Sequence, residues 1–304
     1  MVDVANQDGP LLRRLLSTPG ARGPTELVCG DVQSISRALL LLTTTAEKIT
    51  FDTANKPPPA GSAAYVLWRG PEVGYAIDGF ITMQYANMSA MDHARAFVSL
   101  IRTPTVRSTA LATVARGSLE SLARTWHLLA RDTESDFIYR TISLLRSDLR
   151  YAELLGENIR TRDDDAVDPA ARRRFYAEEL ERLQLPAPAR VDLGRMVSAM
   201  LDAEMDKNDG RMRYSALSSI AHAHRLGINQ FITTGSNGDI NGMAAPRPVV
   251  MDIVGMLTAA TYGTVQAFVA FYGNQTRHVE LLEKAMQRAV RTLGPIMDGI
   301  WSES

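Results

Sequence analysis

Apolar residues recur at helical spacing along most of the chain, and this periodicity limits its fold more than any other feature. Such rows run from Gly74 toward Leu100, from Val106 to Ala130 and from Ser135 to Asn158. Strand-like sequence is confined to about residues 228–248, where an Asn-Gly pair predicts a short β-hairpin or a long loop. The sequence therefore predicts an all-α protein built as an antiparallel helical bundle.

Capping and turn residues predict six further helices. Asp168 is placed to cap the helix that begins at Pro169, because proline suits the first helical position. Gly294-Pro295 is expected to end the last helix. The predicted ranges are Thr25 or Asp31 to Ile49, Pro169 to about Leu185, Asp192 to Asp206, Tyr214 to Arg225, Val249 to about Tyr272 and Thr276 to Leu293.

Three consecutive prolines mark the clearest break in the chain. They lie in the stretch Asn55-Lys-Pro-Pro-Pro-Ala-Gly-Ser. Such a run cannot sit inside a helix, because proline lacks a backbone N–H and clashes with the preceding turn. We therefore predict an N-terminal helical segment over 1–55, a Pro/Gly-rich loop over 56–74 and a main helical bundle domain over 75–304.

The composition is that of a folded protein, with 45% hydrophobic and 22% charged residues. The one cysteine, Cys29, has no partner in the chain, which suits a reducing compartment. The first residues show no basic segment followed by an apolar run, and no apolar stretch reaches the ~20 residues that span a bilayer. We expect a cytoplasmic protein that does not enter a membrane.

The charge is balanced, since 33 Lys and Arg residues face 34 Asp and Glu residues and the formal net charge is −1. A chain of this kind has no overall positive field to attract a polyanion. The balance argues against general nucleic-acid binding, although a local basic patch is compatible with it.

The most unusual local feature is the run Tyr214-Ser-Ala-Leu-Ser-Ser-Ile-Ala-His. Tyr214, Ser218 and His222 are four residues apart and would form one polar stripe on a helix, with Arg211 and Arg225 nearby. His222 is the natural candidate base near neutral pH, and Tyr214 is a second catalytic candidate. Ser218 and the two arginines are candidates for binding an anionic group. The alternative is that these groups satisfy one another's hydrogen bonds in a half-buried layer.

A second polar stripe comprises Arg116, Glu120 and Arg124, which are four residues apart on the helix predicted from Val106 to Ala130. The apolar flanks indicate that this helix is central. Charged side chains in the interior of a protein are either paired with one another or have a functional role. Glu120 is therefore a third catalytic candidate, and the two arginines are candidate substrate-binding residues. The alternative is a ladder of ion pairs on a solvated face, each worth roughly a few tenths of a kcal/mol.

The acidic loop contains Asp164, Asp165 and Asp168, a spacing that resembles the Asp-Asp-x-x-Asp motif of class I terpene cyclases. That resemblance would imply a magnesium diphosphate site. The loop precedes Pro169, and a helix-capping role for its carboxylates is the favoured interpretation. No His-Glu-x-x-His or Glu-x-x-His pattern occurs, so the sequence predicts no metal and no other cofactor.

Two motifs together carry a family resemblance. Arg-x-x-x-Glu-x-x-Ala-Arg begins at Arg116 and Tyr-x-x-Leu-Ser-x-x-x-His begins at Tyr214. With these motifs, residues 75 to 290 resemble a group of bacterial all-helical proteins, which implies a fold and no established activity. That group is distantly similar to the HEPN domains, among them ribonuclease toxins and defence proteins with a short Arg-to-His motif. Arg213 and His222 are too far apart for that motif, and Arg124 and His127 are too close.

These features favour a protein that binds a small organic molecule between the Glu120 helix and the His222 helix. It would act by acid–base chemistry, as a cyclase, lyase or isomerase of specialised metabolism. One alternative is a HEPN-like RNA-binding or ribonuclease protein, in which Arg213 and His222 would meet an RNA backbone. Another is a non-catalytic module that uses its apolar helical faces to form a homodimer.

Overall fold

The computed structural model describes residues 26–54, 56–103, 109–156, 158–160, 166–188, 190–205, 208–234 and 236–302. Within these ranges the chain forms eleven helices and two small antiparallel sheets of two strands each. The predicted all-α bundle is therefore confirmed. The elements are α2 (Cys29–Ala54), α3 (Ala63–Arg69), α4 (Val73–Ile101), α5 (Ala110–Leu129), α6 (Glu134–Leu155), β1 (Ile159–Arg160), β2 (Ala166–Val167), α7 (Pro169–Arg182), α8 (Leu193–Met205), α9 (Gly210–Ala221), α10 (Arg225–Ile228), β3 (Ile232–Thr234), β4 (Ile240–Met243), α11 (Arg247–Phe271) and α12 (Thr276–Ser302).

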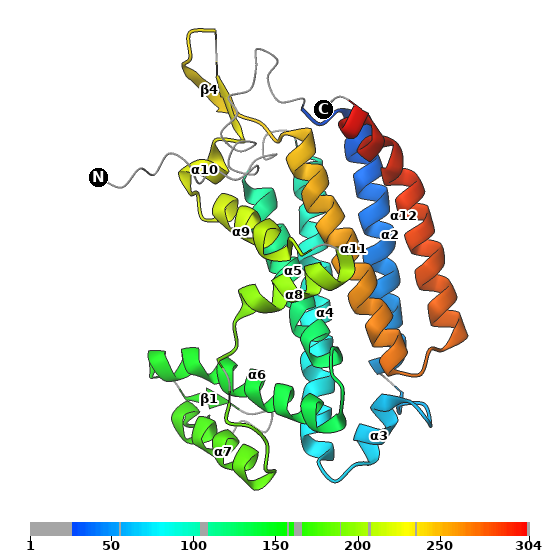
Figure 1. Cartoon of the computed structure of the whole chain (residues 1–304), viewed down its shortest axis with the longest axis vertical. Helices are drawn as coiled ribbons and strands as arrows, with labels where there is room; N and C mark the ends of the chain where they lie inside the picture. Colours follow the sequence, from blue (N-terminus) through cyan, green and yellow to red (C-terminus); the bar gives the residue numbers. More distant parts are fainter. Residues whose placement is uncertain are drawn as a thin grey trace.

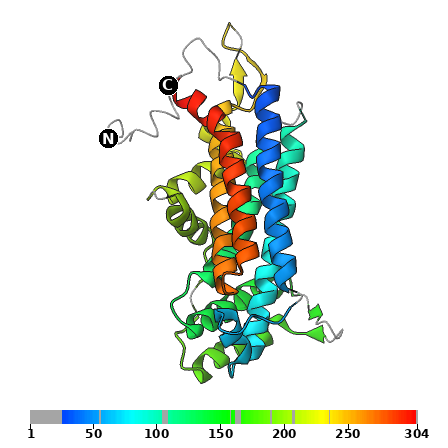
Figure 2. The same cartoon turned by 90° about the vertical axis from the view of Figure 1, so that its right-hand side faces the viewer.

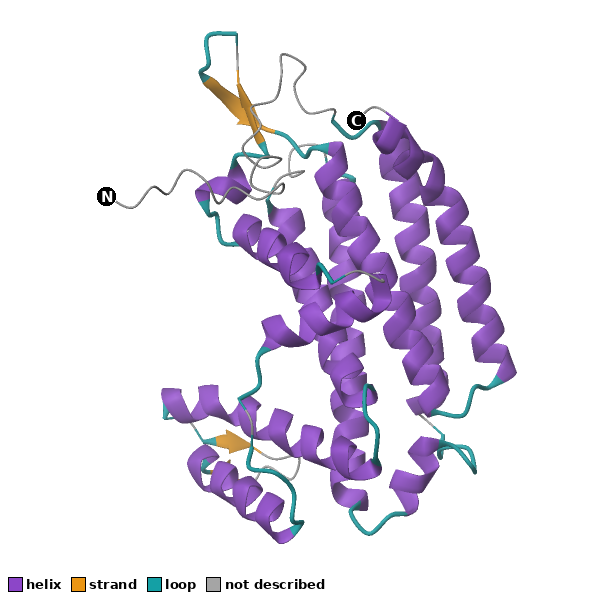
Figure 3. Cartoon of the chain, viewed as in Figure 1, coloured by secondary structure: helices purple, strands orange, loops and turns teal. Residues whose placement is uncertain are grey.

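The long helices α2, α4, α5, α11 and α12 form an elongated bundle (Figure 1). Helices α2, α11 and α12 run side by side on one flank of it (Figure 2). Helices α8, α9 and α10 make a second layer, of which α8 and α9 pack against α5. Helices α6 and α7 pack together at one end of α4, while the β3–β4 hairpin projects from the opposite end of the molecule (Figure 3). Helix α5 is thus central, as its apolar flanks predicted.

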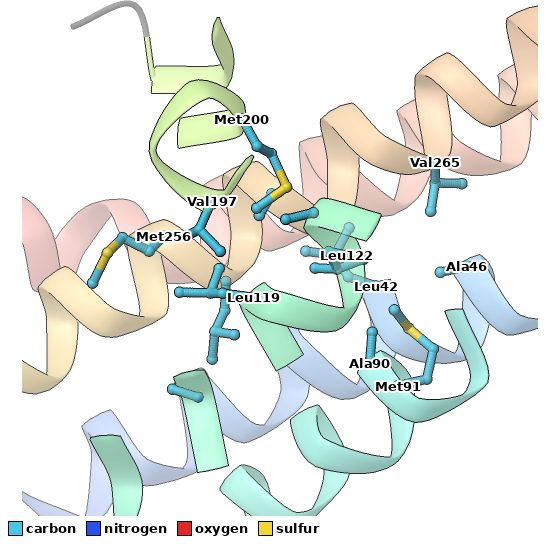
Figure 4. Packing of buried hydrophobic residues seen from close by; sticks show 14 of the residues in the cluster. Leu42, Ala46, Ala90, Met91, Leu119, Leu122, Val197, Met200, Met256 and Val265 are labelled. Atoms are coloured by element: carbon cyan, nitrogen blue, oxygen red, sulfur yellow. The ribbon is translucent and has the colours of Figure 1, made fainter. Parts of the chain in front are cut away.

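The core is continuous around α5. Leu119 and Leu122 of α5 lie among Val197 and Met200 of α8 and Leu42 of α2 (Figure 4), and all five side chains are fully buried. Burial of each such side chain contributes about 1.5–3 kcal/mol. This packing fixes the position of α5, and its remaining face carries the polar stripe toward α9.

Helix α11 is the one helix in the described residues that is long and apolar enough to cross a membrane. Its most apolar window is 67% buried inside the bundle. A core helix of a soluble protein passes the same test of length and composition. Packing against α2, α5, α8 and α12 accounts for its apolar character.

The region around the three prolines differs from the prediction. Residues 56–74 are not all loop, because they contain the short helix α3, which Ser62 caps by accepting a hydrogen bond from the Tyr65 N–H at 3.1 Å. Seven residues are too few to show a helical period. Helix α2 packs against α4, α11 and α12, so the described part of the 1–55 segment belongs to the same bundle. Residues 1–25 lie outside the described part.

Helix α12 continues through Pro295 to Ser302, so its predicted end at Leu293 was wrong. An internal proline costs a helix about 3 kcal/mol, because one hydrogen bond is lost. Leu293 and Ile296 on either side of it are both buried, and their packing offsets that cost.

The predicted hairpin forms: β3 pairs antiparallel with β4 within residues 228–248. The β1–β2 pair was not predicted, because strands of two residues show no alternation. Asp164 and Asp165, which come between β1 and β2 in the sequence, lie outside the described residues. Asp168 caps α7 as predicted, since its side chain accepts hydrogen bonds from the N–H groups of Ala170 and Ala171 at 3.0 and 3.2 Å.

Candidate functional site

Four of the predicted site residues meet where α5 lies against α9. The Arg116 Nε donates to Glu120 Oε1 at 2.6 Å and to the Tyr214 hydroxyl at 3.2 Å. The Tyr214 hydroxyl in turn donates to Glu120 Oε1 at 2.5 Å. The Arg116 Nη1 contacts His222 Nε2. One guanidinium therefore joins the two polar stripes, and we call Arg116, Glu120, Tyr214 and His222 the α5–α9 cluster.

The end of α9 places His222 in this cluster. Helix α9 stops at Ala221, and His222 follows as its C-cap, so the predicted single helix from Tyr214 to Arg225 was wrong. The chain turns at Ala223, whose φ of 56° lies in the left-handed region. The His222 N–H bonds back to the Ser218 carbonyl at 2.9 Å, so His222 keeps a position near the last turn. Its side chain is exposed while that of Tyr214 is half-buried.

The electrostatics of the cluster favour a protonated Tyr214 phenol. Burial and the adjacent Glu120 carboxylate raise the pKa of Tyr214 to about 12, against the opposing effect of Arg116. Burial acts to lower the pKa of Arg116, but its hydrogen bonds to Glu120 and Tyr214 outweigh this and raise it. A guanidinium only donates hydrogen bonds, so in its contact with Arg116 the Nε2 of His222 acts as the acceptor.

The other predicted site residues lie apart from the cluster. Arg124 pairs with Asp148 of α6 at 2.5 Å. Arg211 and Arg225 are exposed on α9 and α10. Ser218 supplies its backbone carbonyl to His222. Arg213, which would meet an RNA backbone together with His222 in the RNA-binding alternative, forms ion pairs with Asp209 and Asp252.

A neighbouring face of α5 supports the cluster through a close contact with α4. A Cβ at Gly117 would lie 2.6 Å from the His93 ring, so only glycine permits this approach. His93 Nδ1 lies 2.7 Å from the Ser89 carbonyl oxygen, and the Ser89 and Ser121 hydroxyls are 3.1 Å apart. These contacts fix how α5 is rotated, and with it the direction of Arg116.

Two polar features of the interior were missed from sequence. Glu204 of α8 lies over Gly263 of α11 and accepts a hydrogen bond from Trp126 Nε1 at 3.1 Å. Burial raises the pKa of Glu204, although the Trp126 hydrogen bond acts in the opposite direction. Burial, aided by Arg140, lowers the pKa of His127 to about 4. The sequence offered two signals, the Glu204 carboxylate in apolar α8 and the glycine Gly263 in apolar α11. That these two residues lie against each other depends on tertiary packing, which the sequence pattern does not give.

A cavity of about 210 Å³ lies at the other end of the molecule. Its walls come from α3, the α3–α4 loop, the start of α6 and the segment after α7, and neither Glu120 nor His222 lines it. At the α5–α9 cluster the two helices instead touch directly through Arg116. The expected site between these helices is thus a half-buried cluster at the molecular surface, with His222 as its exposed member.

Comparison with known proteins adds no relative: no family model, no curated protein and no solved structure matches this chain. The assignment of the candidate site therefore depends only on the arrangement of its own residues.

Proposed function

We propose that the protein binds an anionic small organic molecule at the α5–α9 cluster and acts on it by acid–base chemistry. The observation that carries this proposal is that Arg116 contacts Glu120, Tyr214 and His222 at once. A guanidinium beside an imidazole joins an anion-binding group to a candidate proton acceptor.

The local charge supports an anionic substrate even though the whole chain is almost neutral. From Gly210 to Gly238 the sequence contains no Asp or Glu. The same stretch contains three arginines and two histidines: Arg211, Arg213, Arg225, His222 and His224. Two of these arginines, Arg211 and Arg225, are exposed and carry donors for carboxylate or phosphate oxygens.

Each cluster residue has a distinct role in the proposed reaction. Arg116 binds the anionic group, which replaces His222 on the guanidinium, and the freed Nε2 of His222 takes a proton from the bound substrate. Tyr214 remains protonated at neutral pH and donates a hydrogen bond, since its pKa is raised to about 12. Glu120 orients both Arg116 and Tyr214. Such an arrangement suits a cyclase, lyase or isomerase, and with Cys29 as the one cysteine we place the protein in the cytoplasm.

The test is a thermal-shift screen of the full chain with a panel of small carboxylates and phosphate esters, followed by turnover assays on the hits. His222→Ala and Glu120→Gln should abolish turnover, and Arg116→Ala should also abolish the thermal shift. His224→Ala is the matched control, because that exposed ring lies 6.1 Å from His222 and outside the cluster. If His222→Ala and Glu120→Gln both left binding and turnover unchanged, the proposal would fail.

A second candidate function is RNA binding or cleavage of the HEPN-like kind. The observation that favours it is the exposed contact of Arg116 with His222, which could meet a phosphodiester although Arg213 is held by two carboxylates. Binding of single-stranded RNA that weakens steeply with salt, and cleavage lost in His222→Ala, would support it. Absence of both would eliminate it.

A further inference from the structure

A row of exposed apolar side chains runs along α4. They are between 36% and 69% exposed, and their spacing of four, four, four and three residues places them on one line of the helix. The one charged residue between the ends of this row, Asp78, is half-buried. We call this row the α4 stripe; its members are Val73, Ile77, Ile81, Tyr85 and Met88.

The bundle does not explain the α4 stripe. The opposite face of α4 supplies the core, with Ala76, Met83 and Ala90 fully buried. A surface helix of a monomer normally needs a single apolar face, with polar residues on the other side. A continuous exposed row of large apolar side chains indicates an interaction surface.

We propose that the α4 stripe binds the same stripe of a second copy of this chain, forming a two-fold symmetric dimer with antiparallel α4 helices. From Val73 to Met88 the stripe extends about 22 Å at 1.5 Å per residue. A two-fold axis beside Ile81 brings Ile81 against its counterpart and Tyr85 against Ile77. An apolar row of this kind is complementary to itself, as such an interface requires.

The shape of the row favours this alignment. With the axis at Ile81, the long side chain of Met88 faces Gly74 of the other copy. Gly74 is exposed and a Cβ there would meet nothing within 4 Å, so the surface has room at that point. Methionine is suited to fill such irregular space because its side chain is unbranched and flexible.

The charges at the two ends of the stripe favour the antiparallel orientation. Asp92 is the next exposed residue on the same line beyond Met88. Exposed Arg69 ends helix α3, four residues before Val73, and its guanidinium lies over the Trp68 ring. The antiparallel pair brings each Asp92 to the level of Gly70 of the other copy, next to Arg69 in sequence, and we expect these two charges to pair. A parallel pair would bring the two Asp92 carboxylates together and align the helix dipoles unfavourably.

The test is sedimentation velocity of the full chain over a range of concentrations. The wild type should dimerise, and Ile81→Lys should weaken association by more than about tenfold, because two like charges would meet at the axis. Leu154→Lys is the matched control: Leu154 is 72% exposed on α6, away from the stripe, and its substitution should leave the dimer unchanged. A wild type that stays monomeric would mean that another molecule covers the stripe, and the proposal would be wrong.

The alignment has two tests of its own. Asp92→Arg and Arg69→Asp should each weaken the dimer, and the double variant should restore it, because both ion pairs are then reversed. In a Cys29→Ser background, Ile81→Cys with copper phenanthroline as oxidant should form a covalent dimer, and Leu154→Cys should not. A dimer that survives Ile81→Lys, or a double variant weaker than both single ones, would overturn the antiparallel arrangement.

Discussion

The Arg116 guanidinium contacts the imidazole of His222, 106 positions later in the chain, and this contact unites two polar stripes that lie on separate helices. Arg116 is also bound to Glu120 of its own helix. The side chains of both ion-pair partners are about three quarters buried, at 25% and 23% exposure. The cluster is consequently both a candidate site and a structural link between α5 and α9.

Replacement of Arg116 by Lys should therefore destabilise the fold. A lysine ammonium cannot reproduce the planar fork that reaches Glu120, Tyr214 and His222 together. We expect a loss of about 1–2 kcal/mol in the free energy of unfolding, measured by urea denaturation. Arg124→Lys is the control, since Asp148 is half exposed and such pairs contribute less than about 1 kcal/mol. Equal losses in the two variants would contradict the structural role of Arg116.

Replacement of Glu120 by Gln should lower the pKa of Tyr214 from about 12 toward its ordinary value of 10.0, because a carboxylate that opposes ionisation is removed. Ultraviolet absorbance during alkaline titration measures this pKa, and the signal of Tyr214→Phe is subtracted to isolate one phenol.

The raised pKa of Tyr214 also makes the free energy of unfolding depend on pH. The folded state favours the neutral phenol, so this contribution to stability is fully present below pH 10.0 and is lost as pH rises toward 12. Wild type should thus lose more stability than Tyr214→Phe in that window.

Replacement of Gly263 by Ala should disturb the interior where α8 crosses α11. The new Cβ would lie 1.6 Å from Glu204 Oε2, so Glu204 must move, at a cost of about 1–3 kcal/mol. Gly255→Ala in the same helix is the control, because a Cβ there meets nothing within 4 Å and alanine favours helix. Chemical denaturation of both variants, and of Gly263→Ala combined with Glu204→Ala, measures the coupling. Additive effects would show that the two residues do not compete for space.

Replacement of Glu204 by Gln should stabilise the protein at neutral pH. The raised pKa of Glu204 means that the folded state favours the neutral carboxyl, so its stabilising effect is present below pH 4.5 and is lost as pH rises through the folded-state pKa. Glutamine stays neutral and keeps an oxygen to accept the Trp126 hydrogen bond. Unfolding free energies at pH 7 and pH 4 should show a gain at the higher pH only, and no gain at pH 7 would contradict this prediction.

His127 should make the fold sensitive to mild acid. Its pKa is lowered from 6.5 to about 4, so the unfolded chain binds a proton before the folded protein does. The associated stability is present above pH 6.5 and is lost as pH falls toward 4. His127→Gln should flatten the decrease in unfolding free energy between those pH values, while His224→Gln, at an exposed position, should not.

Helical periodicity predicted the long helices closely, since the row from Gly74 toward Leu100 became α4 from Val73 to Ile101. A long helix that buries one face has apolar residues at helical spacing along its sequence. Short elements such as α3 cannot do so. The i, i+4 spacing likewise placed Arg116 beside Glu120, but spacing along the chain gives no information on which residue of α9 meets Arg116. The Glu204–Gly263 contact was missed for the same reason, because it depends on how α8 crosses α11.

The contact of Gly117 with His93 has a consequence for evolution and engineering of this chain. Arg116 and Gly117 are neighbours in sequence and point about 100° apart around α5, Arg116 toward α9 and Gly117 toward α4, so the direction of the arginine depends on a contact with a different helix. Any larger side chain at Gly117 would turn or lift α5 and misalign Arg116 without touching the cluster. Which substitutions the α5–α9 cluster tolerates therefore depends partly on Gly117, a position outside the cluster itself.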